Sequence, residues 1–370
     1  MLLIRIITNM LAVATLIGVL DRLRGNRWKL GERFDAGFSA FPDLFVVMGG
    51  VLALLPALQK LISPWVVALC DPLGIDPGLL PGIFLANDMG AFHLSHALCR
   101  DPQTADFGGM LIGGILGVNL IFTLPAAITI TDKEDYPFII KGLFCGFLAV
   151  PFGAVAGGLV LGYPFILLWK LVVPVLICTL VIAGLFLKFQ KLVAAISIWS
   201  GKLIAAIALL GLTASIFSFL FQWEEKTATW LTPVREVLWL VGLVVILLPG
   251  AYVLAELLAR GLKNPLIRCS QWLGLDPKAL TGMIISLANS IPVFGLTGEM
   301  SRSGKVAVYA FLFGGAFSLG DHLAFCSAMK PQLLGGLLTA KLVTAFCGLI
   351  FALLLLRYER KNSRSEQGSD

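Results

Sequence analysis

Long apolar runs alternate with short polar stretches along the whole chain, and most of the runs are close to the twenty residues that cross a bilayer as a helix. The short alternating segments of a membrane β-barrel are absent. We therefore expect an all-α polytopic membrane protein. Its eleven apolar segments are predicted at 3–20, 41–62, 79–98, 108–131, 138–162, 166–188, 198–221, 234–258, 279–299, 306–328 and 332–356.

The composition supports a membrane protein and excludes an ordinary soluble domain. Of the 370 residues, 58% are hydrophobic and only 14% are charged. A soluble domain of this size could not hide so much apolar surface from water. The net charge is +6. In a membrane protein such an excess of positive charge usually lies in the cytoplasmic loops. We therefore expect the protein to lie in a lipid bilayer and to have no nucleic-acid partner.

Lysine and arginine indicate which loops face the cytoplasm. Basic residues gather at 21–35, 188–202, 260–268 and 302–305, and in the tail after residue 356. If all eleven segments crossed, two of these basic stretches would face outside.

The charge pattern fits better if segments 79–98 and 279–299 each enter the membrane and return to the same side. Both are interrupted near the middle, at Asn87-Asp88-Met89-Gly90 and at Asn289-Ser290-Ile291-Pro292, where Gly and Pro favour a break. We then predict nine spans and two re-entrant hairpins, with the N-terminus outside and the C-terminus inside. Two broken helices that cross completely are the alternative.

The two interrupted segments belong to an internal repeat. LGIDPGLLPGIFLANDMG (73–90) resembles LGLDPKALTGMIISLANS (273–290), with an offset of 200 that becomes 202 from Leu85 onward. Ser63-Pro64 and Asn264-Pro265 precede the copies, and we expect each pair to open a short helix.

The apolar segments follow the same offset, which divides the chain into parts. We expect a first membrane repeat at 1–162, a linker helix at 163–197, a second membrane repeat at 198–356 and a disordered cytoplasmic tail at 357–370. In the re-entrant topology the repeats are inverted. Inverted repeats with broken helices that hold a ligand near the midplane recur in secondary transporters, although a break can also serve packing alone.

Asp88 is the first candidate for function, because an ionisable group at membrane depth is expensive and usually paired or functional. It could neutralise a cationic substrate, relay a proton, or form a structural ion pair.

Asp321 and His322 are the second candidates, in FGGAFSLGDHLAF, and the repeat places Asn119 opposite them. An adjacent Asp and His could bind a cation or shuttle a proton. A structural hydrogen-bond network is the alternative.

Matched polar and aromatic residues flank the breaks. Asn87 and Asn289 could bind a hydroxyl or cap a half-helix. Phe92 and Phe294 could face a cation, although apolar packing is the simpler interpretation. His93 and His96 could face a cavity or an interface. We discount Asp43 and Glu256 because both are expected near span ends, where solvation is easy.

The sequence offers no cofactor or metal site. Three histidines and seven scattered cysteines form no ligand pattern. No P-loop, HExxH or GxSxG motif occurs, so an enzyme is not expected, although an Asp with a His could do acid–base chemistry.

Several motifs together resemble the ethanolamine-utilisation permease (EutH-type) family from Asp21 to about Arg357. They are DRL, FDAGF, LANDMGAFHL, VPFGAVAGGL, LANSIPVFG and GAFSLGDHLAF. The resemblance implies a multi-pass protein of the bacterial inner membrane that admits ethanolamine, which ethanolamine ammonia-lyase would then consume. It also implies that the Asp of the first hairpin and the GDH of the second half are family features.

The leading hypothesis is therefore a permease for protonated ethanolamine that works by alternating access around a midplane site. A proton- or cation-coupled carrier of another small amine or amino acid is the second hypothesis. A non-transporting intramembrane protein is the third. The sequence leaves open whether transport is coupled to protons and whether the chain forms a homo-oligomer.

Overall fold

The computed structural model describes the backbone of residues 2–367. Side chains are described for these residues except 2, 3, 190, 191, 194, 263, 264, 266, 267, 269–272 and 363–367. Every regular element in this part of the chain is a helix, as the apolar runs predicted.

Eight helical segments are long and apolar enough to cross a membrane, within the described residues. Their outer surfaces expose large apolar side chains, such as Phe165 at 78% and Leu210 at 69%. Water would not tolerate so many, but lipid tails would. The segments are Ile4–Leu23, Leu30–Ala53, Pro102–Ile130, Lys133–Val160, Phe165–Lys188, Ala195–Leu220, Val234–Leu262 and Pro331–Asn362.

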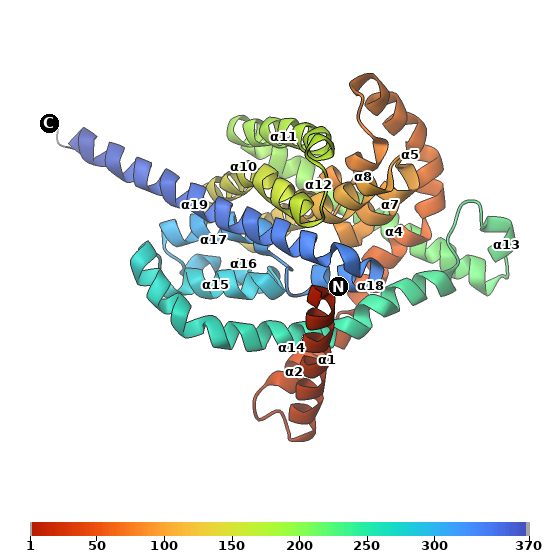
Figure 1. Ribbon diagram of the computed structural model, residues 1–370, viewed down its shortest axis with the longest axis horizontal. Coiled ribbons are helices and arrows are strands. Elements are labelled where there is room, and N and C mark those ends of the chain that lie inside the picture. Colours follow the sequence, from red (N-terminus) through yellow and green to blue (C-terminus); the bar gives the residue numbers. More distant parts are fainter. Residues whose placement is uncertain (1, 368–370) are drawn as a thin grey trace.

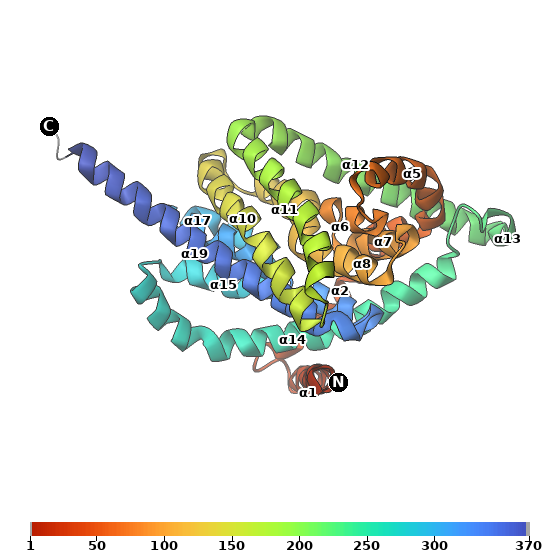
Figure 2. The ribbon, with the colours of Figure 1, turned by 45° about the horizontal axis from the view of Figure 1, so that its top comes forward.

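Three long helices form the centre. Helices α10 (Tyr136–Val160), α17 (Arg302–Gly315) and α19 (Leu334–Gln367) pack against one another. Close contacts at glycine allow this: a Cβ on Gly153 would lie 2.4 Å from the Ala340 carbonyl oxygen. Helix α14 (Val234–Leu273) runs below them and contacts α1 (Leu2–Leu23), α2 (Leu30–Ser39) and α18 (Asp321–Met329) (Figures 1 and 2).

The remaining helices flank this centre. Two long ones, α11 (Phe165–Lys188) and α12 (Gln190–Leu220), join the halves of the chain. The second apolar segment is made of α2, α3 (Phe41–Leu44), η1 (Phe45–Gly49) and α4 (Gly50–Ala53), and α5 (Leu55–Cys70) follows it. The membrane-spanning segment Pro102–Ile130 consists of α8 (Pro102–Ala105), the π-helical stretches η5 (Asp106–Gly117) and η6 (Asn119–Thr123), and α9 (Leu124–Ile130). The short helix α13 (Glu224–Thr227) lies between α12 and α14.

Several predicted boundaries were wrong. The second span begins at Leu30, not at residue 41, because α2 continues through Ala40 into α3. Residues 260–268, expected as a loop, continue α14 to Leu273. Pro64 and Pro265 lie inside α5 and α14, so neither opens a helix. Segment 306–328 is not one helix, because α17 ends at Gly315 and α18 starts at Asp321.

The tail was also expected to be disordered, but α19 continues through it to Gln367. Glu359 in this extension accepts a 2.6 Å hydrogen bond from Lys141 on α10, which ties the helix to the rest of the protein. Residues 368–370 lie outside the described part.

Each repeated motif makes the same turn. Gly74 and Gly274 take left-handed conformations, with φ of 64° and 67°, which only glycine adopts without strain. The carboxylates of Asp76 and Asp276 then cap the next helical turn by accepting from Gly78 N–H and Ala279 N–H, at 2.8 and 2.9 Å.

The same two carboxylates also bind the far end of each interrupted segment. Asp76 accepts from the N–H groups of Arg100 and Asp101, and Asp276 accepts from the N–H and the hydroxyl of Ser301. Each segment therefore begins and ends at one point. The first comprises α6 (Leu80–Phe84), η4 (Asn87–Ala91) and α7 (Phe92–Leu98), and the second comprises α15 (Pro277–Ala288), α16 (Ile291–Leu296) and η8 (Thr297–Glu299).

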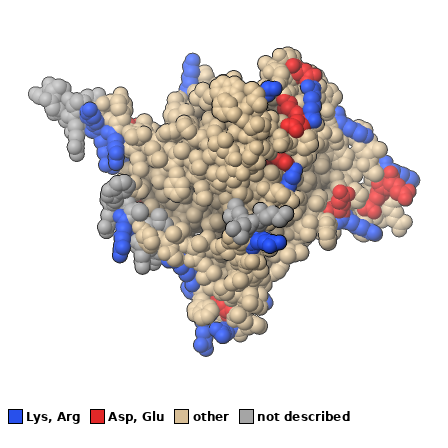
Figure 3. All heavy atoms as spheres, in the orientation of Figure 1, with Lys and Arg blue, Asp and Glu red and all other residues tan. Residues whose placement is uncertain are grey.

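Charged side chains gather at the ends of the molecule and leave a broad uncharged surface between them (Figure 3). In this view most of the acidic side chains lie at the right, where α13 projects, together with several basic ones, and further basic side chains lie at the left and around the tip formed by α1 and α2. Such a separation is typical of a protein whose middle faces lipid.

Candidate functional site

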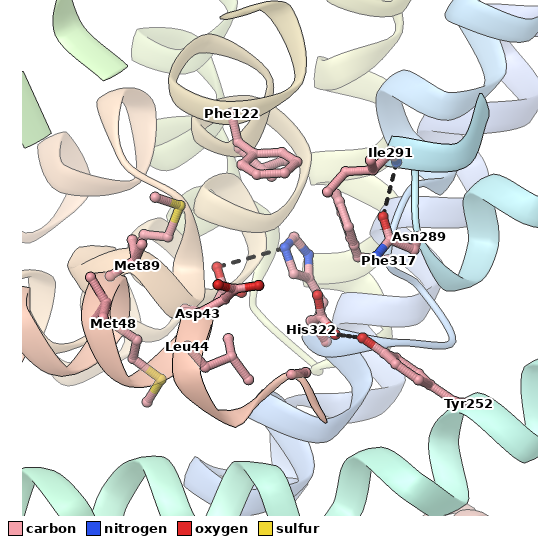
Figure 4. A pocket seen from close by; sticks show the side chains of 16 residues that line it. Asp43, Leu44, Met48, Met89, Phe122, Tyr252, Asn289, Ile291, Phe317 and His322 are labelled. Atoms are coloured by element: carbon pink, nitrogen blue, oxygen red, sulfur yellow. Dashed lines mark hydrogen bonds and ion pairs between the residues drawn. The ribbon is translucent and has the colours of Figure 1, made fainter. Parts of the chain in front are cut away.

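A cavity of about 400 Å³ lies where broken elements from both halves meet (Figure 4). Its polar lining comes from Asp43, Asp88, Tyr252, Asn289, Asp321 and His322. Its apolar lining includes Leu44, Val46, Val47, Met48, Met89, Val118, Phe122, Ile291 and Phe317. A largely apolar hollow with a few convergent polar groups is typical of a small-molecule site.

Asp88 reaches the cavity because the first segment unwinds beside it. Leu85 and Ala86 are extended between α6 and η4, and Gly90 has a φ of 102°. The side chain of Asp88 is 13% exposed, so it opens onto the cavity and not onto bulk solvent.

Asp321 and His322 reach the cavity through a second break, between α17 and α18. The chain there pairs with the end of α15, because Phe317 N–H donates to the Ser286 carbonyl at 3.0 Å and Leu319 N–H to the Leu287 carbonyl at 2.7 Å. Asp321 then begins α18, where the helix dipole favours a negative charge.

Hydrogen bonds fix these groups. Tyr252 on α14 donates its hydroxyl to Asp321 Oδ1 at 2.8 Å. His322 Nε2 lies 3.8 Å from Asp88 Oδ1, close enough for attraction but too far for a good hydrogen bond. Figure 4 marks both interactions with dashed lines.

Lys341 on α19 lies behind His322 and does not line the cavity. It is fully buried, and its Nζ donates to the Gly114 carbonyl at 2.7 Å and lies 3.1 Å from His322 Nδ1. A buried ammonium needs such partners.

The charges around the cavity favour a cation. Three carboxylates, those of Asp43, Asp88 and Asp321, line it, and the described lining contains no lysine or arginine. Even with Lys341 counted, carboxylates outnumber ammonium groups. A bound cation would restore the balance at lower desolvation cost than an anion.

Four of the eight predicted site residues line the cavity: Asp88, Asn289, Asp321 and His322. Asn289 also caps α16, since its Oδ1 accepts from Ile291 N–H at 2.9 Å.

The other four are buried beside it. Asn87 donates to Met110 Sδ at 3.6 Å, and Asn119 donates to the carbonyls of Ile115 and Phe313 at 3.0 and 2.7 Å. Phe92 packs edge-on against Phe325, and Phe294 stacks on Tyr309. The contacts of Asn87, Phe92 and Phe294 hold the two interrupted segments against their neighbours, whereas Asn119 links η6 to α17.

His96 belongs to a different polar cluster. Its Nε2 lies 3.0 Å from Asp106 Oδ1, and Lys330 donates to both oxygens of Asp106 at 2.7 Å. His93 packs its ring against Phe92 and Phe325. Neither histidine lines the cavity.

Sequence reasoning missed three polar residues of this region. Asp43 was discounted as lying near a span end, but with Leu30 as the first residue of the span it lies near the middle. Lys341 carried the same signal as Asp88, an ionisable residue in an apolar run. Tyr252 carried none, because tyrosine is common in membrane helices. Among the described residues, no group of three or more His, Cys, Asp or Glu side chains could hold a metal ion.

Comparisons with known proteins agree with the resemblance in the motifs. The family described as "Ethanolamine utilisation protein, EutH" matches residues 3–355. A protein of Listeria monocytogenes named "Probable ethanolamine permease EutH" is 32% identical over 364 residues, which cover 98% of this chain and 97% of that protein. The Escherichia coli protein of the same name is 31% identical and covers 89% of this chain and 86% of its own length.

An uncharacterised Bacillus subtilis protein, YxeR, is 33% identical over 90% of this chain and 89% of its own. No solved structure matches the chain. The family match spans nearly the whole sequence, and all three of these relatives are more than 30% identical over most of their own length. The chain therefore belongs to the EutH family of ethanolamine utilisation proteins.

Proposed function

We propose that this protein is a multi-pass permease of the bacterial inner membrane that carries protonated ethanolamine into the cell. The observation that carries the proposal is one cavity faced by Asp88 from the first repeat and Asp321 from the second. The names of the relatives, probable ethanolamine permeases, point to the same substrate.

The ammonium group of ethanolamine would lie between the two carboxylates. Burying an ammonium without a partner is very unfavourable, and a carboxylate compensates by charge and by charge-assisted hydrogen bonds. Phe122 and Phe317, whose ring centroids are 5.6 Å apart, line the cavity as well and suit the methylene groups.

The hydroxyl group would bind Asn289. Because Asn289 Oδ1 already accepts from Ile291 N–H, its amide nitrogen is the group left to donate to the hydroxyl oxygen.

Transport would follow from the repeat. The two segments whose ends are bound together by Asp76 and by Asp276 are called the tied segments. In this proposal they are re-entrant hairpins that enter from opposite faces, with the N-terminus outside and the C-terminus inside. A site built from both repeats opens to one face and then the other as the repeats rock against each other.

Uptake of labelled ethanolamine into proteoliposomes tests this function. We expect saturable uptake by the wild type. Asp88→Asn and Asp321→Asn should each reduce uptake about tenfold or more, because a hydrogen bond to a charged group contributes about 1.5–3 kcal/mol. Asp71→Asn is the control, since Asp71 pairs with Arg100 on the exposed surface.

Three outcomes would separate the alternatives. Full activity of folded Asp88→Asn and Asp321→Asn would remove the cavity from the mechanism. Uptake of another amine or amino acid in preference to ethanolamine would identify a different carrier. Accumulation that depends on an imposed proton gradient would indicate coupling, whereas equilibration that ignores the gradient would indicate facilitated diffusion.

A further inference from the structure

We propose that Lys341 is a positioning residue that keeps His322 neutral, so that the charge of Asp88 is left for the substrate. This inference rests on the proposed function and assigns a role to a buried lysine that lies outside the cavity wall.

The position of Lys341 determines where the imidazole carries its hydrogen. Its Nζ lies 3.1 Å from His322 Nδ1 and donates to the Gly114 carbonyl. With an ammonium as neighbour, Nδ1 must act as the acceptor. The hydrogen of the neutral ring then sits on Nε2, which faces Asp88 Oδ1 at 3.8 Å.

Lys341 and His322 together carry one positive charge. Lysine is the stronger base by about four pH units in model compounds, so the proton stays on Lys341. A second proton on His322 would place two positive charges in contact inside the protein, which is strongly unfavourable.

The other groups around His322 do not change this conclusion. From its own helix and from α14 come Asp321 and Tyr252, which bind each other. From η4 comes Asp88, from α3 comes Asp43 across the cavity, and from the turn before α18 comes the Phe317 ring, 5.4 Å away. The carboxylates would favour an imidazolium if Lys341 were absent. Burial of the ring and the ammonium of Lys341 together prevent it.

The consequence concerns competition at Asp88. A neutral Nε2–H faces the Asp88 carboxylate without cancelling its charge. An imidazolium in the same place would be a built-in competitor for the substrate ammonium.

The test compares the pH dependence of KM for ethanolamine uptake in proteoliposomes between pH 5.5 and 8. Ethanolamine, an alkylamine, stays largely protonated over this range. Protonation of Asp88 and Asp321 affects wild type and variant alike, so the readout is the ratio of variant KM to wild-type KM at each pH. In Lys341→Met, which keeps a long side chain but no charge, this ratio should rise several-fold from pH 8 to 5.5, as expected when a histidine that can take up a proton competes with the substrate for Asp88.

The double variant Lys341→Met/His322→Gln supplies the matched control, because the ratio of its KM to that of the wild type should not depend on pH. A lysine that served only packing would lower the maximal rate or the yield of folded protein, and would leave the pH profile of KM unchanged. A pH profile of KM in folded Lys341→Met that parallels that of the wild type therefore overturns the proposal.

A second measurement does not use Lys341→Met, so it holds even if that variant fails to fold. The chain has three histidines, and nitrogen-15 NMR of labelled histidine, assigned with His322→Gln, reports the state of each ring. We expect neutral His322 with its hydrogen on Nε2 at pH 6. An imidazolium, or a hydrogen on Nδ1, would refute the role of Lys341. Absence of saturable wild-type uptake at every pH would instead refute the proposed function and leave the NMR result standing.

Discussion

At the scale of single residues, Tyr252 provides a sharp test of the cavity, because it comes from α14 and not from either tied segment. It donates its hydroxyl to Asp321 at 2.8 Å. In Tyr252→Phe the carboxylate keeps its charge but loses an orienting donor. We expect KM for ethanolamine to rise several-fold, up to about tenfold, because only part of the roughly 1.5–3 kcal/mol of such a bond acts through Asp321 on the substrate. Uptake kinetics in proteoliposomes measure this change.

Tyr163→Phe is the matched control for this variant. Tyr163 donates to the Gln103 carbonyl at 3.2 Å and does not line the cavity. Loss of the Tyr163 hydroxyl should lower the stability of the protein but leave KM for ethanolamine unchanged. Equal KM values for both variants and the wild type would show that Tyr252 does not position Asp321 for the substrate.

The sequence identified the cavity residues only where a rare residue type made them visible. Asp88, Asp321 and His322 stood out as ionisable groups in apolar runs, and all three line the cavity. Lys341 stood out equally and was overlooked. The buried positions of Asn87, Asn119, Phe92 and Phe294 could not be foreseen, because sequence spacing does not say which side of a broken helix faces a cavity and which faces a neighbour.

At the scale of elements, the contact between η5 and the first segment depends on glycine. A Cβ on Gly117 would lie 1.9 Å from the Leu85 carbonyl oxygen, which belongs to the unwound stretch before Asp88. Gly117→Ala should therefore displace this stretch, destabilise the protein by about 1–3 kcal/mol or more, and reduce uptake. Thermal unfolding in detergent and vesicle uptake measure the two effects.

Gly242→Ala is the control, because a Cβ there meets nothing within 4 Å and the residue lies inside α14. It should be neutral or stabilise the helix by up to about 1 kcal/mol. A Gly117→Ala protein as stable and active as Gly242→Ala would mean that the unwound stretch does not rest on η5.

The turn at Asp276 gives a pH-dependent prediction. Burial opposes ionisation of this carboxyl, but the Ser301 hydroxyl and the N–H groups of Ala279 and Ser301 outweigh it and lower the pKa of Asp276. A lowered pKa stabilises the fold above the unfolded value of about 3.9, and this stability is lost as pH falls through the folded value.

Asp276→Asn should therefore destabilise the protein at pH 7 by about 0.5–2 kcal/mol, the usual effect of losing a helix cap. The difference from the wild type should shrink below about pH 4. Asp132→Asn should have little effect at either pH, because exposed Asp132 makes no capping hydrogen bond. Thermal unfolding of the wild type and both variants at pH 7 and pH 3.5 tests this prediction. If Asp276→Asn is less stable than the wild type by the same amount at both pH values, the turn does not depend on the charge of Asp276.

Apolar runs predicted the helices better than their ends. Breaks at Asn87–Gly90 and Asn289–Pro292 were foreseen from Gly, Pro and Asn, but the break between Gly315 and Asp321 was missed because its sequence is apolar and lacks proline. It is held open by backbone hydrogen bonds to the end of α15, a tertiary contact that no local pattern encodes. The opposite error occurred in α14, where a loop was predicted around Pro265 but the helix continues to Leu273. A helix can contain proline when packing supports it.

At the scale of the whole molecule, the turns at Asp76 and Asp276 are built alike, and the proposed inverted repeat places them on opposite sides of the membrane. Gln103 is exposed and Ser303 partly exposed, at equivalent positions just beyond the two tied ends. In a background free of the seven native cysteines, Gln103→Cys should react with an impermeant thiol reagent on intact cells. Ser303→Cys should react only after the cells are lysed.

The outcome bears directly on the mechanism, because an inverted pair of hairpins lets one rocking motion close one side of the cavity while it opens the other. Reaction of both cysteines from the same face would make the repeats parallel. The two acids would still share a cavity, but the symmetry could no longer exchange its outward and inward openings. Reaction from opposite faces would support an inverted repeat in which the cavity between Asp88 and Asp321 is reached from each face of the membrane in turn. The uptake of the Asp88→Asn and Asp321→Asn variants would then measure how much this cavity contributes to transport.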